Sequence, residues 1–267
     1  MRFHYLLFIA FWCLLLTACT GPENQANDGK QKTSKQSENN ARKNELEKDT
    51  AYQKPAWLKD ANIVDFLKHY GKENPENKIK ISTPYGDIVV ELFEETPLHR
   101  ANMIYLVKDE EYFNGTLFYR VVKDFIIQAG QKDDERTQEK RFLIGKYTIP
   151  KEMNTPYFHE LGAVSMARNY TDNPEKRSSP YDFFIIVGRK QTDFGLDMIE
   201  KEYGIELTPY QRKIYMERGG APHLDGEHTV IGRVVSGLDL AIAISKKETD
   251  GGEWPLVDIP ITIDVIP

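Results

Sequence analysis

Beyond residue 77, apolar and polar residues alternate along several short stretches, as they do in β-strands. Residues 78–83 alternate in this way, a Pro-Tyr-Gly-Asp turn follows at 84–87, and 88–93 are again strand-like, which predicts a hairpin. Residues 118–131 hold two apolar runs around a Lys-Asp pair and predict a strand, a tight turn and a second strand. Residues 259–266 alternate as a last strand.

The segment before these strands has a different pattern. In residues 51–70 apolar side chains recur near helical spacing, and Gly71 is expected to end that helix. Residues 51–77 are therefore predicted to be a helical lead-in. We expect this helix to pack on the domain rather than to bind a partner.

Three more helices are predicted among and after the strands. Thr96 and Pro97 form an N-cap and first-position pair before a helix that includes residues 99–108. Two helices are expected at 193–203 and 209–218, where glycines follow each one as stop signals.

The N-terminus has the pattern of a targeting segment. Arg2 precedes an apolar run at 5–16, which is too short for a stable membrane span and is typical of a signal peptide. The following residues, Thr17-Ala18-Cys19 after Leu16, resemble the bacterial lipobox, whose cysteine becomes diacylated. We expect residues 1–18 to be a lipoprotein signal peptide and Cys19 to carry the lipid. The alternative is an ordinary signal peptide with a chance cysteine.

Residues 19–50 are almost entirely polar, with no aromatic side chain. Such a segment cannot bury enough apolar surface to offset its conformational entropy, so a disordered tether is predicted, with a span of about 30 Å. Two acyl chains would anchor it stably to a membrane. Thr20 replaces the aspartate that retains lipoproteins at the inner membrane of enteric bacteria, so we expect an outer-membrane protein facing the periplasm.

Composition narrows the function further. The chain has 267 residues, of which 40% are hydrophobic, and its net charge of −6 argues against nucleic acid as a partner. Both cysteines lie in the first twenty residues, so the domain has neither an internal disulfide nor a cysteine nucleophile. His223 and His228 are close in sequence but lack the pattern of a metal site. We predict no metal and no cofactor.

The stretch at 118–131 contains one unusual residue. Arg120 is a permanently charged side chain in an apolar segment, and burying it without a partner is costly. From these residues alone, two interpretations remain open: a surface arginine on an edge strand and a functional arginine.

The same stretch resembles the cyclophilin signature, with Phe118-Tyr-Arg-Val-Val followed by Phe125-Ile-Ile-Gln-Ala-Gly. The resemblance runs from about Ile79 to the C-terminus and includes residues 162–167, 182–186 and 223–235. It implies a mainly β fold, a closed eight-stranded antiparallel barrel with two capping helices, over residues 78–267. Residues 188–222 would be a helical insert, interpreted as a packed elaboration with a lid or a partner-binding arm as the alternatives.

The resemblance also implies site residues. Arg120 would donate a hydrogen bond to the prolyl nitrogen, and Gln128 would orient Arg120 and bind the substrate backbone. The proline pocket would consist of Phe125, Ile126, Phe184 and Leu224, with His228 at its edge and Ala167 where backbone meets substrate. For Phe125 and Phe184, core packing is the simpler explanation when each is taken alone.

Three positions depart from the family pattern. His223 stands where animal members often have Trp, which predicts weak cyclosporin binding. Ala129 replaces a glycine. Asp182 stands where a substrate-binding Gln is usual, and its carboxylate is expected to pair with Arg120 or Arg168 and to compete with substrate.

Three functions are therefore weighed. The first is a monomeric, lipid-anchored peptidyl-prolyl cis/trans isomerase that binds proline-containing peptides and assists the folding of cell-envelope proteins. The second is a non-catalytic peptide-binding module on the same barrel. The third is an unrelated β-barrel lipoprotein with a small ligand inside. The two helices available to plug the barrel argue against this third function.

Overall fold

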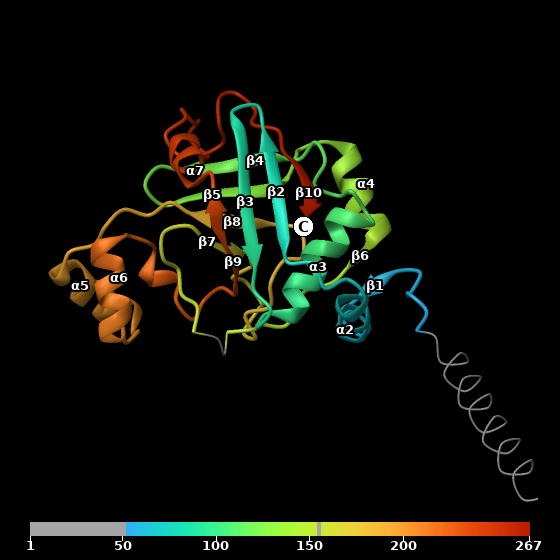
Figure 1. Cartoon of the computed structure of the whole chain (residues 1–267), viewed down its shortest axis with the longest axis horizontal. Helices are drawn as coiled ribbons and strands as arrows, with labels where there is room; N and C mark the ends of the chain where they lie inside the picture. Colours follow the sequence, from blue (N-terminus) through green and yellow to red (C-terminus); the bar gives the residue numbers. More distant parts are fainter. Residues whose placement is uncertain (1–51, 154–155) are drawn as a thin grey trace, which may run out of the picture. The chain divides into compact units, whose positions relative to one another are not determined.

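A computed structural model describes residues 52–153 and 156–267 of the chain (Figure 1). The predicted signal peptide at 1–18, the lipidated Cys19 and the tether up to residue 50 lie outside these residues and stay predictions. In the part of the chain that is described, no helix is both long enough and apolar enough to cross a membrane.

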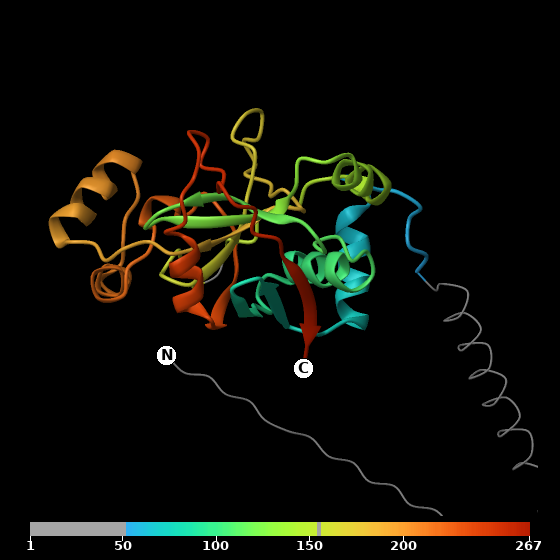
Figure 2. The ribbon, with the colours of Figure 1, turned by 90° about the horizontal axis from the view of Figure 1, so that it is seen from above.

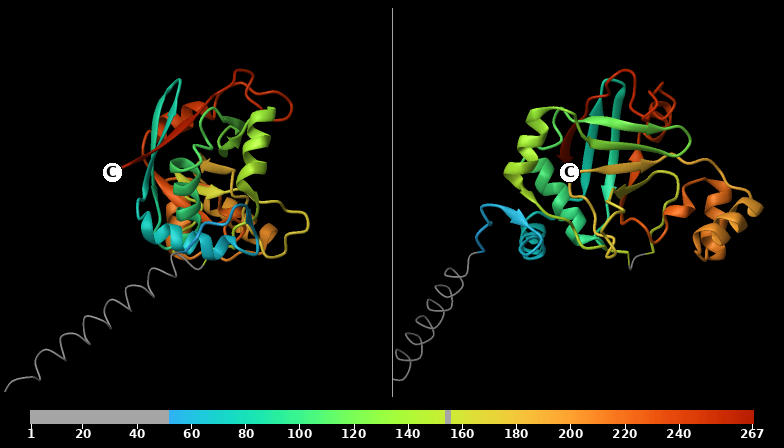
Figure 3. Two further views of the ribbon diagram at one scale, coloured as in Figure 1. Left: turned by 90° about the vertical axis from the view of Figure 1, so that its right-hand side faces the viewer. Right: turned by 180° about the vertical axis from the view of Figure 1, so that it is seen from behind.

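One antiparallel sheet of eight strands forms the centre of the domain, in the order β10–β2–β3–β9–β7–β8–β5–β4. The sheet curls strongly, as Figures 1 and 3 show from several sides. Its strands are β2 (Lys78–Thr83), β3 (Gly86–Leu92), β4 (Leu117–Val122), β5 (Ile126–Gln131), β7 (Ala163–Met166), β8 (Phe183–Ile186), β9 (Val230–Ser236) and β10 (Thr262–Ile266). The predicted hairpin and the predicted strand pair around residues 118–131 are confirmed.

The prediction of a closed barrel is wrong, because β10 and β4 are the free edges of the sheet and form no continuous ladder. Instead, the residues before β10 meet the start of β4 through an isolated bridge between Leu117 and Pro260. The Phe118 N–H also donates to the Ile259 carbonyl at 3.0 Å. On the other side of this bridge, the Ile261 N–H donates to the Thr116 carbonyl at 2.8 Å. The result is a half-barrel.

Helices cover the two sides of this half-barrel. Figures 1 and 2 show α3 and α7 on opposite sides of the strands, where two capping helices are expected. The helices are α2 (Ile63–Glu73), α3 (Pro97–Lys108), α4 (Glu135–Ile144), α5 (Asp193–Tyr203), α6 (Pro209–Glu217), the 3₁₀ turn η1 (Pro222–Leu224) and α7 (Leu238–Ile244). Two short parallel strands, β1 (Leu58–Lys59) and β6 (Gly145–Lys146), pair beside them.

The N-terminus of α3 is capped differently from the prediction. Thr96 precedes the helix, but its hydroxyl donates to the Phe93 carbonyl at 3.3 Å and caps no helical N–H. The carboxylate of Glu152 accepts the N–H groups of Leu98 and His99 instead, at 3.1 and 3.0 Å. An acidic side chain from a distant loop therefore satisfies the first turn of the helix.

Gly71 does not end the lead-in helix. Helix α2 begins at Ile63 and continues through Gly71 to Glu73. A Cβ at Gly71 would lie 3.0 Å from the Cβ of Ala101 in α3. The glycine thus permits close packing of α2 on α3, which a helix-stop interpretation of the sequence misses.

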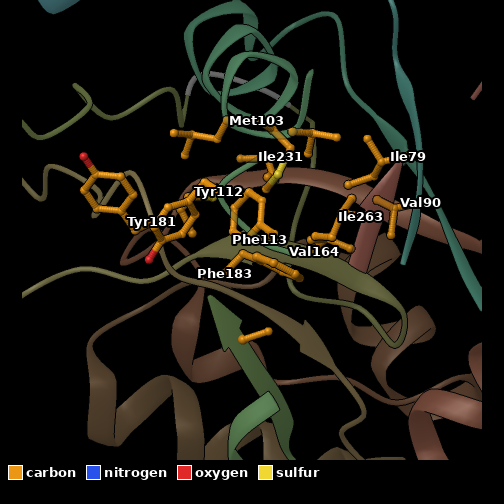
Figure 4. Close-up of a cluster of buried hydrophobic side chains, with 14 of the residues drawn as sticks. Ile79, Val90, Met103, Tyr112, Phe113, Val164, Tyr181, Phe183, Ile231 and Ile263 are labelled. Carbon is orange, nitrogen blue, oxygen red and sulfur yellow. The ribbon is translucent and has the colours of Figure 1, made fainter. Parts of the chain in front are cut away.

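The main hydrophobic core fills the concave side of the sheet, and α3 closes it (Figure 4). The labelled side chains of β2, β3, β7, β9 and β10 point toward Met103 of α3 and toward a group of aromatic rings. Phe113 and Phe183 are edge-to-face in this group, with ring centroids 5.6 Å apart. Side chains fill this interior, as the helices available to plug the barrel led us to expect.

The two predicted helices of the insert are confirmed as α5 and α6. Gly204 ends α5 in the left-handed conformation, and Thr208 forms a capping box with Gln211 at the start of α6. The insert packs on Phe158 in a small core whose other members are Leu196, Leu207, Ile214 and Tyr215. Figures 1 and 3 show it at the end of the domain away from α2.

Candidate active site

A β-bulge shapes the centre of the candidate site. Phe118 pairs with Ala129 and Arg120 pairs with Gln128, so Tyr119 is the extra residue on β4. Such a bulge turns a side chain away from the regular alternation of the strand. The Tyr119 hydroxyl consequently lies within reach of Gln128, whose side-chain amide donates a hydrogen bond to it. Burial raises the pKa of Tyr119, which keeps its phenol protonated.

Arg120 is held from the other end of the chain. Its Nε donates to Oε2 of Glu253 at 2.6 Å, and the two side chains are 37% and 42% exposed. No other residue in the described part of the chain accepts a hydrogen bond from this guanidinium. Gln128 faces Tyr119 rather than Arg120, so the expectation that Gln128 orients Arg120 is not met in this structure.

The apolar residues predicted for the pocket lie together in a cluster separate from the main core. Ile126, Phe184 and Leu224 are buried in it, and Phe125 and Ala167 pack against it while remaining half-buried. We call these five residues the pocket cluster. Phe184 lies directly opposite Gln128 across β5 and β8, which places the cluster beside the polar centre of the site.

Ala167 is placed at the rim, but its backbone is already paired. Its N–H donates to the Asp182 carbonyl at 2.9 Å, and its carbonyl accepts from Ser179 N–H at 2.8 Å. A carbonyl has two lone pairs, so one acceptor site remains for a ligand.

His228 forms the buried edge of the pocket cluster, with its ring edge-to-face on Phe184 at 5.2 Å. Nδ1 lies 3.0 Å from the Met166 carbonyl and must donate to it. Nε2 is therefore the acceptor for the hydroxyl of Tyr170, at 2.6 Å. Burial lowers the pKa of His228 to about 4, so the ring is neutral at physiological pH.

His223 joins the pocket cluster to the insert. Its ring lies between Phe125 and Tyr203, with centroid distances of 5.2 and 5.4 Å. Tyr203 is the last residue of α5. Burial lowers the pKa of His223 as well. One side of the pocket cluster is thus extended by an aromatic side chain from the insert.

Asp182 is not paired with Arg120 or Arg168, and this prediction is wrong. Its Oδ1 accepts from Nη2 of Arg141 at 2.9 Å, and its Oδ2 accepts from the Ser179 hydroxyl at 2.8 Å. Arg141 belongs to α4, a helix that is not among those predicted from the sequence. Arg168 pairs with Glu227 instead. Both carboxylate oxygens of Asp182 therefore have partners, and neither of them contacts Arg120.

Several contacts of the site have no signal in the sequence. Glu253 lies 133 residues from Arg120 along the chain, and Tyr170 lies 58 residues from His228. His159 is buried behind Phe184, with the two rings stacked at 6.3 Å, and its Nδ1 lies 2.9 Å from Asp225. Only the tertiary structure brings these residues to the site.

The site offers hydrogen-bond donors and an apolar surface. Within residues 52–153 and 156–267, no group of three His, Cys, Asp or Glu side chains is placed to bind a metal ion.

Comparison with known proteins decides the family. The model described as cyclophilin type peptidyl-prolyl cis-trans isomerase/CLD matches residues 78–264. This chain belongs to the cyclophilin family. A Streptococcus pyogenes protein, provisionally named a bifunctional phosphatase/peptidyl-prolyl cis-trans isomerase, is 31% identical over 216 residues. The match covers 78% of this chain but only 43% of that relative.

Other similar proteins match over most of their own length. A relative from Staphylococcus saprophyticus, provisionally named a peptidyl-prolyl cis-trans isomerase, is 30% identical over 206 residues, which are 75% of this chain and 98% of the relative. The crystal structure of a Cryptosporidium parvum cyclophilin aligns with a TM-score of 0.50 at 22% identity, over 71% of this chain and 99% of that one. The structural likeness shows the cyclophilin fold.

Proposed function

We propose that this cyclophilin catalyses cis/trans isomerisation of the peptide bond before proline and so assists the folding of cell-envelope proteins. The observation that carries the proposal is the position of Arg120. Its guanidinium is partly exposed, has terminal donors to spare and lies on the strand paired with Gln128, beside the pocket cluster.

The reaction needs no nucleophile and no metal. Rotation about the amide has a barrier of about 18–20 kcal/mol because it breaks resonance, and the prolyl nitrogen regains a lone pair when the amide twists. A donor that reaches this nitrogen binds the twisted state more tightly than the planar one. Each tenfold gain in rate requires about 1.4 kcal/mol of such preference, and a charge-assisted hydrogen bond in a dry site supplies energy of this order.

The other side chains of the site have complementary roles in this proposal. Phe125, Ile126, Phe184 and Leu224 hold the proline ring by apolar contact. Gln128, positioned by the Tyr119 hydroxyl, donates to or accepts from the substrate backbone. These roles anchor the ring while the residue before it rotates.

A proline-containing peptide is the expected ligand. The Cryptosporidium parvum cyclophilin was crystallised in the presence of the dipeptide Ala-Pro. By analogy, the pocket cluster of this chain takes the prolyl ring of an X-Pro unit in an unfolded polypeptide. The apolar lining and the neutral His228 suit an uncharged ring.

A protease-free isomerisation assay on an X-Pro peptide tests the proposal. Arg120→Ala is expected to lower kcat/KM at least tenfold, because it removes the donor. Arg233→Ala is the matched control. Like Arg120, Arg233 is a strand residue that pairs with a glutamate, but it lies outside the site. Full activity of Arg120→Ala would refute the proposed role of Arg120.

The alternative is a peptide-binding module without catalysis. The same assay separates the two functions, because a module would bind the peptide and leave its exchange rate unchanged. In that case Arg120→Ala would change affinity alone.

We further propose that Cys19 is lipidated and anchors a monomeric cyclophilin to the outer membrane, facing the periplasm. The support is the signal-peptide pattern at 1–18 and the lipobox-like residues before Cys19. Cells grown with a clickable palmitate analogue should label the wild-type chain and not Cys19→Ser. Labelling of the serine variant would contradict the assignment, and fractionation of the labelled chain would show which membrane it occupies.

A further inference from the structure

The loop that carries Glu253 is a compact, internally braced turn between α7 and β10. We call residues 249–255 the Glu253 loop. Oδ1 of Asp250 accepts the N–H groups of Gly252 and Trp254 at 2.8 and 2.9 Å. The Asp250 N–H in turn donates to the Trp254 carbonyl at 2.8 Å, and a bridge joins Thr249 to Pro255. These bonds give the tip of the loop a defined shape.

The backbone of Glu253 is fastened to the strand that carries Arg120. Its carbonyl accepts the N–H of Val121, the residue after Arg120, at 2.9 Å. Glu253 itself has a φ of +65°, a left-handed conformation that residues other than glycine, asparagine and aspartate rarely adopt. The surrounding hydrogen bonds therefore hold this residue in an unfavourable conformation, as is common at functional positions.

The side chain of Glu253 engages only one edge of the guanidinium. Oε2 accepts from Nε at 2.6 Å, while no described residue accepts from the two terminal Nη groups. This geometry fixes the plane of the guanidinium and leaves its outer donors for a ligand. The next residue, Trp254, packs its ring 5.8 Å from that of Tyr119, which is the partner of Gln128.

The Glu253 loop thus contacts both polar side chains of the site, one directly and one through Tyr119. We propose that Glu253 is a positioning residue for the isomerase reaction, which holds the Arg120 guanidinium in the orientation that donates to the prolyl nitrogen. This inference rests on the proposed function. It adds a residue that the signature stretch at 118–131 does not contain.

A simpler explanation is an ordinary surface ion pair. Pairs as exposed as this one contribute little to stability, because solvent screens them. The backbone anchor at Val121 and the one-edge contact distinguish Glu253 from such a pair. A substrate on the pocket cluster would also displace water from the pair and strengthen its orienting effect.

The test uses the full-length protein in detergent micelles, with Glu253→Ala, Glu253→Gln and the control Glu91→Ala. Glu91 pairs with Nε and Nη2 of Arg233 outside the site. Glu253→Ala is expected to lower kcat about tenfold and to change KM less than twofold. Glu253→Gln, whose amide oxygen still accepts from Nε, should recover most of the activity, and Glu91→Ala should match the wild type.

A spectroscopic readout separates positioning from loss of fold. In ¹⁵N-arginine spectra, the Nε–H signal of Arg120 should move to the free-arginine position in Glu253→Ala and should stay displaced in Glu253→Gln. Unchanged or raised kcat in Glu253→Ala would overturn the inference while leaving the proposed function intact. An inactive wild type would instead refute the proposed function, and the positioning role with it.

Discussion

At the residue scale, Asp182, the residue before β8, forms a partly buried ion pair with Arg141 of α4. The Arg141 guanidinium also donates to the Gly130 carbonyl at 2.9 Å and to the Tyr112 hydroxyl at 2.6 Å. Removal of Asp182 would leave the Arg141 guanidinium in a poorly hydrated position with one partner fewer. The pair is therefore structural, and Asp182 does not compete for Arg120.

Asp182→Ala is expected to lower the free energy of unfolding by about 2–4 kcal/mol, since breaking a buried pair is costly and this pair is partly hydrated. Urea denaturation measures the change. Asp264→Ala is the control, because Asp264 is exposed and its Nζ–Oδ2 distance to Lys80 is 3.7 Å. A loss as small as that of the control would show that the pair contributes no stability.

The neutral His228 gives the fold a pH dependence. Its pKa in the folded protein is about 4, below the ordinary value of 6.5, so the unfolded chain binds the proton more readily between these values. The contribution of neutral His228 to the free energy of unfolding should be fully present above pH 6.5. It should fall by about 3 kcal/mol as the pH drops toward 4. Denaturation curves of wild type and His228→Asn at pH 7.5 and 4.5 measure this, and an identical pH dependence in both proteins would contradict it.

At the scale of elements, local sequence signals predict the insert well. The Thr208-Pro209 pair, Gly204 and the helical spacing of apolar residues indicate α5 and α6, because caps and glycine stops act within a few residues. The same rule fails at Gly71, whose role depends on Ala101 in another helix. Local rules cannot show which glycine serves a tertiary contact.

The insert also affects the site through Tyr203. Tyr203→Ala would expose the ring of His223 to water and reduce the burial that lowers its pKa. The pKa of His223 should rise toward 6.5, as measured by NMR titration of its ring proton. Tyr210→Ala, on the other helix of the insert, is the matched control and should leave His223 unchanged. An unaltered titration in Tyr203→Ala would mean that the insert does not cover His223.

At the scale of the whole molecule, strand pattern and family resemblance predict the antiparallel sheet, the helices on its two sides and the gathering of Phe125, Ile126, Phe184 and Leu224. They do not predict the open edge, where an isolated bridge between Leu117 and Pro260 takes the place of a continuous ladder. They also miss the partners of Asp182 and Arg120. Those contacts join residues that are distant in sequence, and their choice depends on the path of surface loops.

The protein as a whole is a half-barrel whose curled sheet holds an arginine donor beside an apolar pocket cluster. The central claim is that this arrangement catalyses prolyl isomerisation. The most direct measurement is exchange NMR of an X-Pro peptide with the protein at a few per cent of the peptide concentration, for wild type and Arg120→Ala. The account predicts that wild type speeds cis/trans exchange well above the uncatalysed rate and that Arg120→Ala loses most of this gain. Peptide binding by wild type without faster exchange would contradict it.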